Sequence, residues 1–302
     1  MRDVLKSLYN IEPKLLVKYT NKVYKVSCDD ETYCLKYIDN VDNDKVLEKL
    51  NYLDNDCFLL PHKNNIRTNR NFYNNKQFYL YDWLNEDEAD NKDLKLKYYL
   101  NRIGKMHNQS SFTSNVAISY YKELKMQIEE KQQETYALLE KEISQFEKDD
   151  YHSPFEWNFL NNYHIFIESL DKSKKYLEQF SKLTENKSII RQVITHQNFS
   201  YDHVFLNKNK ISGNEKMKIA SPVEEFTSLF NNCDFKTVDF SGCFNEYLKN
   251  NELDEVEKNR LLSLLFININ KKTNDDFSSL VNLNQSLYKI KSIEEIVKIL
   301  NV

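Results

Sequence analysis

Glycine is nearly absent from this sequence. The 302 residues contain three glycines, Gly104, Gly213 and Gly242. A glycine-rich loop brings the backbone close to the phosphates of a nucleotide, because glycine has no Cβ and tolerates positive φ angles. The sequence contains neither a GxGxxG motif nor a Walker A motif. Any nucleotide that binds to this chain is therefore held without the usual close approach of the backbone.

Length, charge and hydropathy limit the number of domains and the kinds of partner that this chain can have. A chain of 302 residues is long enough for one two-lobed domain or for two small domains. Charged residues make up 29% of the chain, the net charge is -4 and both signs are interspersed, so there is no basic stripe of the kind that binds nucleic acid. No apolar run reaches the roughly 18 residues of a membrane-spanning helix. We expect neither nucleic acid nor a membrane as a partner.

The cysteines and the first residues indicate a cytoplasmic protein. The five cysteines form no CxxC motif and no pair with the spacing of zinc ligands. Scattered cysteines in odd number are typical of reduced cytosolic thiols. Residues 1–16 are too charged for a secretory signal, so we expect the protein to stay in the compartment where it is made. The cysteines are Cys28, Cys34, Cys57, Cys233 and Cys243.

Strand patterns dominate the first part of the chain. Residues 22–28 and 32–38 alternate in character around a polar turn, which predicts a hairpin. Residues 43–53 place leucines on one face and predict a helix. Residues 57–60 and 77–84 predict two further strands, and the polar stretch between them predicts a loop or the end of a hairpin.

Helical patterns take over from about residue 90. Ser153 and Glu156 form a capping box, and Pro154 occupies the first helical position between them. Residues 188–220 predict a β unit within this helical part. The predicted helices cover 94–107, 117–148, 154–183, 253–266 and 292–301, the last opened by Ser292.

These patterns predict an α+β protein with two lobes. A small β-rich lobe covers residues 1–84, and a larger helical lobe covers residues 85–302. No flexible linker separates them, so we expect a short hinge near residues 82–85.

Lys36 and Glu48 are the first candidates for chemistry. Lys36 shares one face of its predicted strand with Cys34 and Ile38. Such a lysine either points into a cleft and holds phosphates, as the strand lysine of kinases does, or is an ordinary solvated lysine. Glu48 lies on the following helix, as the ion-pair partner of that lysine does in kinases. Its alternative role is that of a surface glutamate.

Several segments together resemble a known family. The chain resembles, over nearly its full length, the spore-coat kinase-like proteins of endospore-forming Gram-positive bacteria (the CotS and YsxE type). That family belongs to the aminoglycoside phosphotransferase and protein-kinase-like superfamily. The resemblance is carried by NKVYKVSCDDETYCLKYI, YLYDWLNEDE, LNRIGKMHNQSS, HSPFEWNFLNNYHIFIESLDKSKKYLEQF and ITHQNFSYDHVFLN.

The resemblance implies a bilobal kinase-like fold and ATP as a ligand, with or without magnesium. It also implies that Lys36, Glu48, Asp82 and Leu84 are nucleotide-binding residues. In enzymes of this class the catalytic loop reads His-Gly-Asp-xxxx-Asn, and Asn198 stands at the position of the catalytic aspartate. The two positions that bind the metal in that class are degenerate here and fall on His203 and Ser221.

The residues at these positions do not suit phosphate transfer. The amide of Asn198 has no titratable carboxylate and cannot act as a general base. The imidazole of His203 is a poor ligand for magnesium, which prefers oxygen donors. His196, in the same loop, is expected to face the core and to form a hydrogen bond with the backbone.

Three hypotheses follow. The leading one is a pseudokinase that acts as a binding or scaffolding protein of the spore-coat type, with coat or other proteins as partners. It is then located in the cytoplasm, or in the spore coat if the organism sporulates. The second is an active, atypical small-molecule kinase in which Asp202 or Glu224 recruits a metal and the acidic residues 86–88 form the rim of a site for a cationic substrate. The third is an assembly component without a ligand, whose 20 tyrosines provide adhesive surface.

Overall fold

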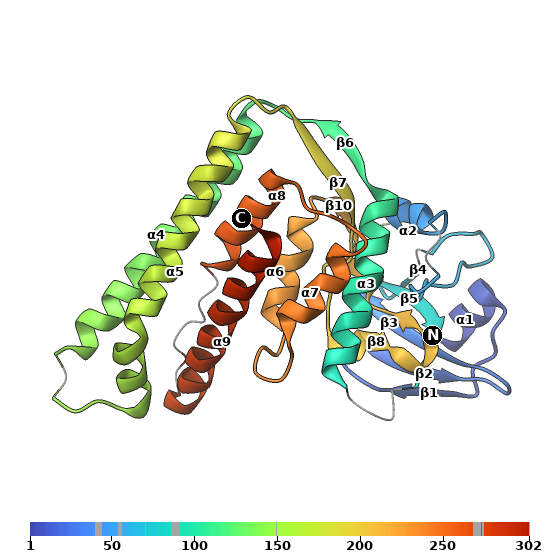
Figure 1. Cartoon of the computed structure of the whole chain (residues 1–302). Helices are drawn as coiled ribbons and strands as arrows, with labels where there is room; N and C mark the ends of the chain where they lie inside the picture. The colour runs from blue at the N-terminus through green and yellow to red at the C-terminus, as the bar shows by residue number, and fades with distance from the viewer. Residues whose placement is uncertain are drawn as a thin grey trace. The chain divides into compact units, whose positions relative to one another are not determined.

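The computed structural model describes residues 1–39, 44–53, 56–69, 71–85, 91–148, 150–267, 273 and 275–301. The chain forms two compact units (Figure 1). The first unit consists of Met1–Asn91 and Ile194–Ile219, and the second of Lys92–Val193 and Ala220–Val302. The first unit therefore takes up a segment that the sequence analysis assigned to the helical lobe.

Hydrogen bonds explain why residues 194–219 belong to the first unit. Ile211 N donates to Cys57 O at 2.7 Å, and Leu59 N donates to Ile211 O at 2.8 Å. Asn214 Nδ2 also donates to Leu59 O at 2.7 Å. The strand predicted at 57–60 is instead an isolated bridge between Phe58 and Ile211.

A five-stranded antiparallel sheet forms most of the first unit. Its strand order is β1-β2-β3-β5-β4. The strands predicted at 22–28, 32–38 and 77–84 are confirmed, and so is the helix predicted at 43–53. The first helix and both edge strands of the sheet were not predicted from the sequence. The elements are α1 (Arg2–Tyr9), β1 (Leu15–Lys18), β2 (Val23–Ser27), β3 (Thr32–Ile38), α2 (Asp44–Leu50), β4 (Asn71–Tyr73) and β5 (Lys76–Asp82).

The two faces of this sheet have different roles. Leu35 of β3 and Leu80 of β5 are buried in a cluster with Leu5 of α1. Because side chains alternate along a strand, Cys34 and Lys36 point to the opposite face. That face is one wall of a pocket. The alternation in the sequence thus places Lys36 correctly.

The β unit predicted at 188–220 is confirmed and consists of short elements. Strand β7 pairs antiparallel with β6, in a sheet of order β10-β7-β6. Strands β8 and β9 form a separate small hairpin. The bounds are β6 (Phe112–Asn115), β7 (Ile189–Thr195), β8 (Val204–Phe205), β9 (Lys210–Ile211) and β10 (Lys218–Ala220), with 3-10 turns at Tyr201–His203, Leu206–Lys208 and Asn214–Lys216.

Helices make up most of the second unit. Figure 1 shows α4 and α5 side by side as a long hairpin. Helix α5 packs against α9, and residues of all three helices share a cluster that includes Phe146, Phe159 and Leu283. The predicted capping box is confirmed, because Glu156 N donates to Ser153 Oγ and Ser153 N donates to Glu156 Oε2. The helices are α3 (Lys92–Ser110), α4 (Ser119–Phe146), α5 (Pro154–Thr184), α6 (Val223–Asn232), α7 (Phe240–Leu248), α8 (Glu255–Leu265) and α9 (Asp276–Leu300).

One predicted helix start is wrong. Helix α9 begins at Asp276 behind the cap Asp275, and Ser292 lies in its interior. The buried residues Leu283, Ile290 and Ile296 continue one helical face across that position. The sequence analysis also missed α6 and α7.

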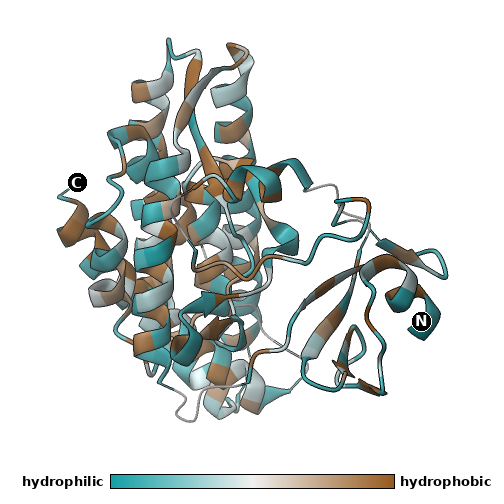
Figure 2. Ribbon diagram, turned by 90° about the vertical axis from the view of Figure 1, so that its right-hand side faces the viewer, coloured by the Kyte–Doolittle hydropathy of each residue, from teal (hydrophilic) through white to brown (hydrophobic). Residues whose placement is uncertain are grey.

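Hydrophobic and hydrophilic residues alternate along these helices. Figure 2 shows hydrophobic and hydrophilic stretches alternating along the long helices, as expected of helices that bury one face. Within the described residues, no helix combines the length and the apolar character needed to cross a bilayer.

Candidate functional site

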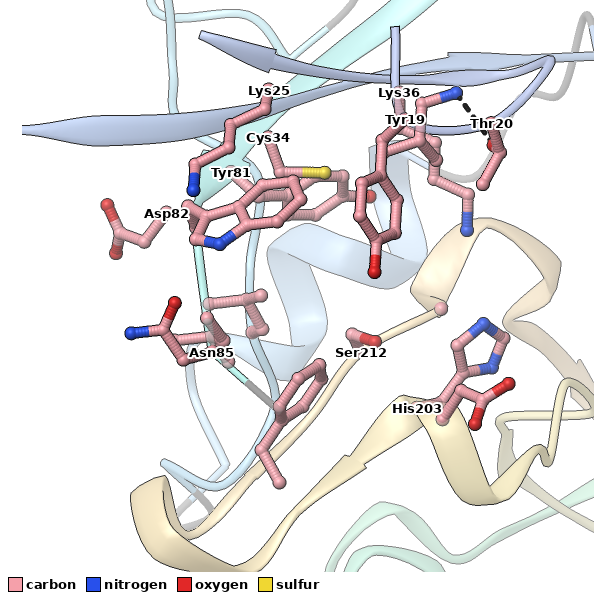
Figure 3. A pocket seen from close by; sticks show the side chains of 17 residues that line it. Tyr19, Thr20, Lys25, Cys34, Lys36, Tyr81, Asp82, Asn85, His203 and Ser212 are labelled. Atoms are coloured by element: carbon pink, nitrogen blue, oxygen red, sulfur yellow. Dashed lines mark hydrogen bonds between the residues drawn. The ribbon is translucent and has the colours of Figure 1, made fainter. Parts of the chain in front are cut away.

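A pocket of about 650 Å³ lies within the first unit. Strands β2, β3 and β5 supply one wall, and residues 82–85 and 202–213 supply the others. Figure 3 shows Lys25, Cys34 and Lys36 extending from the sheet, with His203 and Ser212 on the other side of the pocket. The pocket therefore combines the predicted strand lysine with the loop that follows β7.

Lys36 forms an ion pair inside this pocket, and its partner is Glu215. Lys36 Nζ lies 2.5 Å from Glu215 Oε1, and the side chains are 20% and 14% exposed. Burial by itself would raise the pKa of Glu215, but Lys36 outweighs it and holds that pKa below its usual value. Glu215 is therefore a carboxylate at neutral pH. It neutralises the lysine that the sequence analysis expected to hold phosphates.

The predicted pair between Lys36 and Glu48 is not formed. Helix α2 buries Leu47 and Leu50, which are 1% and 2% exposed. Glu48 lies on the exposed side of the same helix. The apolar residues of α2 set the direction of this glutamate, and they turn it to solvent.

Asn198 contacts the same carboxylate. Asn198 Nδ2 donates to Glu215 Oε1 at 3.1 Å and to Gly213 O at 2.9 Å. Both N–H groups of the amide are thus directed at acceptors within the chain. The residue at the position implied for the catalytic aspartate is here a hydrogen-bond donor that helps to hold Glu215.

Gly213 makes this arrangement sterically feasible. Its φ angle is 87°, in the region that favours glycine. A Cβ at this position would lie 2.7 Å from His203 Nδ1 and 2.8 Å from Asn198 Nδ2. One of the three glycines of the chain is therefore required at the centre of the pocket loop.

The two histidines of the loop bind backbone carbonyl groups. His203 Nδ1 lies 2.8 Å from Asn198 O, and since a carbonyl only accepts, this nitrogen carries the proton. Burial lowers the pKa of His203, so the ring is neutral. His196 is fully buried and its Nε2 donates to Ser212 O at 3.0 Å. The prediction of a core-facing His196 that bonds the backbone is confirmed.

Two of the positions considered for metal binding, Ser221 and Glu224, lie in the second unit. Glu224 contacts Arg260 as an ion pair. Glu225 is fully buried and accepts a hydrogen bond from Tyr99 at 2.5 Å. Ser221 precedes α6 and is buried. No group of three or more His, Cys, Asp or Glu side chains suited to a metal ion occurs among the described residues.

The predicted hinge residues line the pocket. Asp82 and Leu84 both belong to its wall, and Asp82 Oδ1 lies 2.8 Å from His62 Nε2. Asp202 also lines the pocket. The acidic residues 86–88, expected to form a substrate rim, lie outside the described residues.

Several residues in and beside the pocket were not predicted from the sequence. Glu215 lies in a short turn that has no periodic pattern. The pocket-facing position of Lys25 could have been predicted, because Lys25 and Val23 lie on the same face of β2 and Val23 also lines the pocket. Tyr19 and Trp83 lie outside the strands, where alternation gives no signal.

Comparisons with known proteins bear on the fold. No protein-family model and no curated protein matches the chain. Among solved structures, an aminoglycoside phosphotransferase from Alicyclobacillus acidocaldarius is similar, with a TM-score of 0.72, 10% identity and coverage of 100% of this chain and 95% of that chain. The AMP-bound spectinomycin phosphotransferase APH(9)-Ia has a TM-score of 0.53, 14% identity and coverage of 100% and 94%. The chain therefore has the kinase-like fold of the aminoglycoside phosphotransferases.

Proposed function

We propose that this protein is a kinase-like binding protein that does not transfer phosphate. One observation carries the proposal: Lys36 and Asn198 both donate to Glu215 Oε1. The pocket thus lacks a carboxylate at the position of the base, and its lysine is already neutralised. The loss of a positioned general base typically costs a factor of about 10² to 10⁴ in rate.

A nucleotide is the ligand that the fold suggests first. The solved relatives include a complex with AMP and one with ADP and spectinomycin. We propose that ATP enters between Asp82, Leu84 and Lys36, with or without magnesium, and that Glu48 takes no part because it faces solvent. ATP phosphates must then displace Glu215 from Lys36. Leaving a fully buried charge unpaired costs about 3–5 kcal/mol. The partial exposure of this pair makes the cost here smaller.

A scaffolding role follows from the same proposal. A kinase-like chain without phosphate transfer acts through what it binds, and the resemblance to spore-coat proteins supports coat or other proteins as partners. The location is then the cytoplasm or the spore coat.

An active phosphotransferase is the second candidate. The carboxylate of Asp202 lines the pocket, and Lys36 is in place on β3. In this alternative Asp202 holds magnesium, and Lys36 leaves Glu215 for the phosphates.

An ATP turnover assay separates the two. We expect wild-type protein to release no ADP from millimolar ATP and magnesium, with a panel of aminoglycosides, choline, homoserine and sugars as acceptors. The Lys36→Ala variant is the matched control for trace contaminating kinase. Turnover that needs magnesium and disappears in Lys36→Ala would overturn the proposal in favour of the active enzyme.

A further inference from the structure

The pocket contains two lysines whose surroundings differ. In the register of β2 and β3, Lys25 pairs with Cys34 and Lys36 pairs with Val23. The two lysines therefore share one face of the sheet as diagonal neighbours. Figure 3 shows both side chains reaching into the pocket with their ammonium groups turned apart and Tyr19 between them in this view.

Lys36 is poorly available to a ligand. Its ammonium group is 2.5 Å from a carboxylate oxygen of Glu215, and the pair is largely buried. An anion that took Lys36 would leave the charge of Glu215 without its counter-charge, and this is unfavourable in a buried place. The lysine that kinases use for phosphates is thus occupied within the chain.

Lys25 is available. Its Nζ lies 4.8 Å from the centre of the Trp83 ring. A cation over an aromatic face keeps its N–H donors free for an acceptor. No carboxylate within ion-pairing distance of Lys25 occurs in the part of the chain that the structure describes, and nearby Asp82 is bound by His62.

The walls around Lys25 suit a flat apolar group. Tyr19 and Trp83 meet edge to face, with ring centres 5.2 Å apart and an interplanar angle of 83°. Val23, Leu84 and Phe205 also line the pocket. Apolar and aromatic walls with a few polar groups that fix orientation are typical of small-molecule sites.

We propose that this pocket binds a small aromatic carboxylate, with its ring against Trp83 and Val23 and its carboxylate on Lys25 Nζ. The proposal rests on the proposed function in one respect, that the pocket binds its ligand without phosphate transfer. Glu215 neutralises Lys36 and Asp202 adds a negative charge, so a second anionic group on the ligand finds no free lysine. A single negative charge can therefore be held on Lys25 without displacing Glu215, whereas the phosphates of a nucleotide on Lys36 must displace it.

Calorimetric titration of the full-length protein with 1-naphthoate tests this inference. We expect 1-naphthoate to bind at least about tenfold more tightly than the uncharged 1-naphthalenemethanol, because a charge-assisted hydrogen bond to Lys25 is lost with the alcohol. Lys25→Met should weaken 1-naphthoate by a similar factor, and Lys25→Arg should retain binding. Lys22→Met is the matched control, since Lys22 lies on the same hairpin, pairs with Asp39 and does not line the pocket.

Three results would overturn the inference. They are equal affinity for the acid and the alcohol, a larger loss with Lys36→Met than with Lys25→Met, and no binding up to about 10 mM 1-naphthoate. Thermal melts of each variant show whether it is folded, and Lys25→Arg separates loss of charge from loss of structure. ATP turnover is decided in a separate assay, so the proposed function and this inference can fail independently.

Discussion

Each unit of the molecule contains a carboxylate that accepts a hydrogen bond from a side chain, but the surroundings of the two carboxylates differ. In the first unit, Glu215 accepts from Asn198 and from Lys36, which lines the pocket, and the side chain of Glu215 is 14% exposed. In the second unit, Glu225 is fully buried, accepts from Tyr99 and faces His107 Nε2 at 3.8 Å. The first carboxylate neutralises a lysine that lines a pocket, whereas the second is closed off from solvent.

The second arrangement continues through several helices. His107 Nδ1 lies 2.8 Å from Tyr247 OH, which accepts from Asn251 Nδ2 at 2.5 Å. Asn251 Oδ1 in turn accepts from Arg191 NH1 at 3.2 Å. The chain of contacts ties α3, α7 and β7 together. A buried carboxylate that accepts from a neutral hydroxyl stabilises the fold, whereas a carboxylate paired with a pocket lysine controls access to that lysine.

The largest expected effect comes from breaking the buried arrangement. Glu225→Ala leaves the hydroxyl of Tyr99 without its acceptor and opens a cavity, so we expect a loss of about 3 kcal/mol in the free energy of unfolding. Denaturant unfolding measures this. Glu48→Ala, at an exposed position, is the control and should stay within about 0.5 kcal/mol of wild type. A change below about 1 kcal/mol for Glu225→Ala would contradict the structural role.

A smaller effect is expected from an aspartate at the position implied for the catalytic base. In Asn198→Asp, a carboxylate replaces the amide that lies 3.1 Å from Glu215 Oε1. Like charges at this distance repel and raise the pKa of the pair, so we expect a loss of about 1–2 kcal/mol at pH 8. A carboxyl with a raised folded pKa is stabilised by protonation, so the difference should shrink as the pH falls towards 5.

Asn198→Asp should also release no ADP from ATP, because Lys36 stays paired with Glu215. Unfolding at pH 8 and pH 5, together with a turnover assay, checks both parts. Equal losses at the two pH values would contradict the like-charge account.

The last effect is confined to acid pH and concerns the histidines. Burial lowers the pKa of His107 and His203, although Glu225 and the Asn198 carbonyl act in the opposite direction. The unfolded chain, with a histidine pKa of about 6.5, then binds more protons than the folded chain. Stability should therefore fall as the pH drops below about 6.5, by up to about 1.4 kcal/mol per pH unit for each histidine.

His107→Gln separates the two histidines. The variant should lose its own share of the pH dependence and keep that of His203. Unfolding curves between pH 5 and pH 8 measure the slopes. Identical slopes for wild type and variant would show that His107 does not titrate differently in the folded state.

Local patterns explain what the sequence could predict. The alternation of side chains along β3 predicted that Lys36 points to the pocket face. The capping box of Ser153 and Glu156, which spans only four residues, predicted the start of α5. The ion-pair partner of Lys36 could not be predicted from the sequence, because Glu215 is 179 residues away and lies in a turn without periodicity. Glu48, which lies closer to Lys36 in the sequence, was predicted as this partner. Leu47 and Leu50 determine which face of α2 is buried, and Glu48 lies on the other face.

In α9, a local pattern predicted a helix start that the structure does not have. Ser292 with following glutamates has the composition of a helix start, yet burial of Ile290 and Ile293 keeps this turn inside α9. The residue that caps the helix is Asp275, which accepts hydrogen bonds from Phe277 N and Ser278 N. No periodic pattern in the sequence marks this position. Tertiary packing decided between the two candidates.

Titration of ATP into wild-type protein and Glu215→Gln, each without magnesium, tests the central claim most directly. If Glu215 occupies the lysine that would hold phosphates, removal of its charge frees Lys36, and Glu215→Gln should bind ATP at least about tenfold more tightly than wild type. The ATP should remain intact in both cases. Weaker binding by Glu215→Gln, or wild-type binding that requires magnesium and yields ADP, would contradict the account.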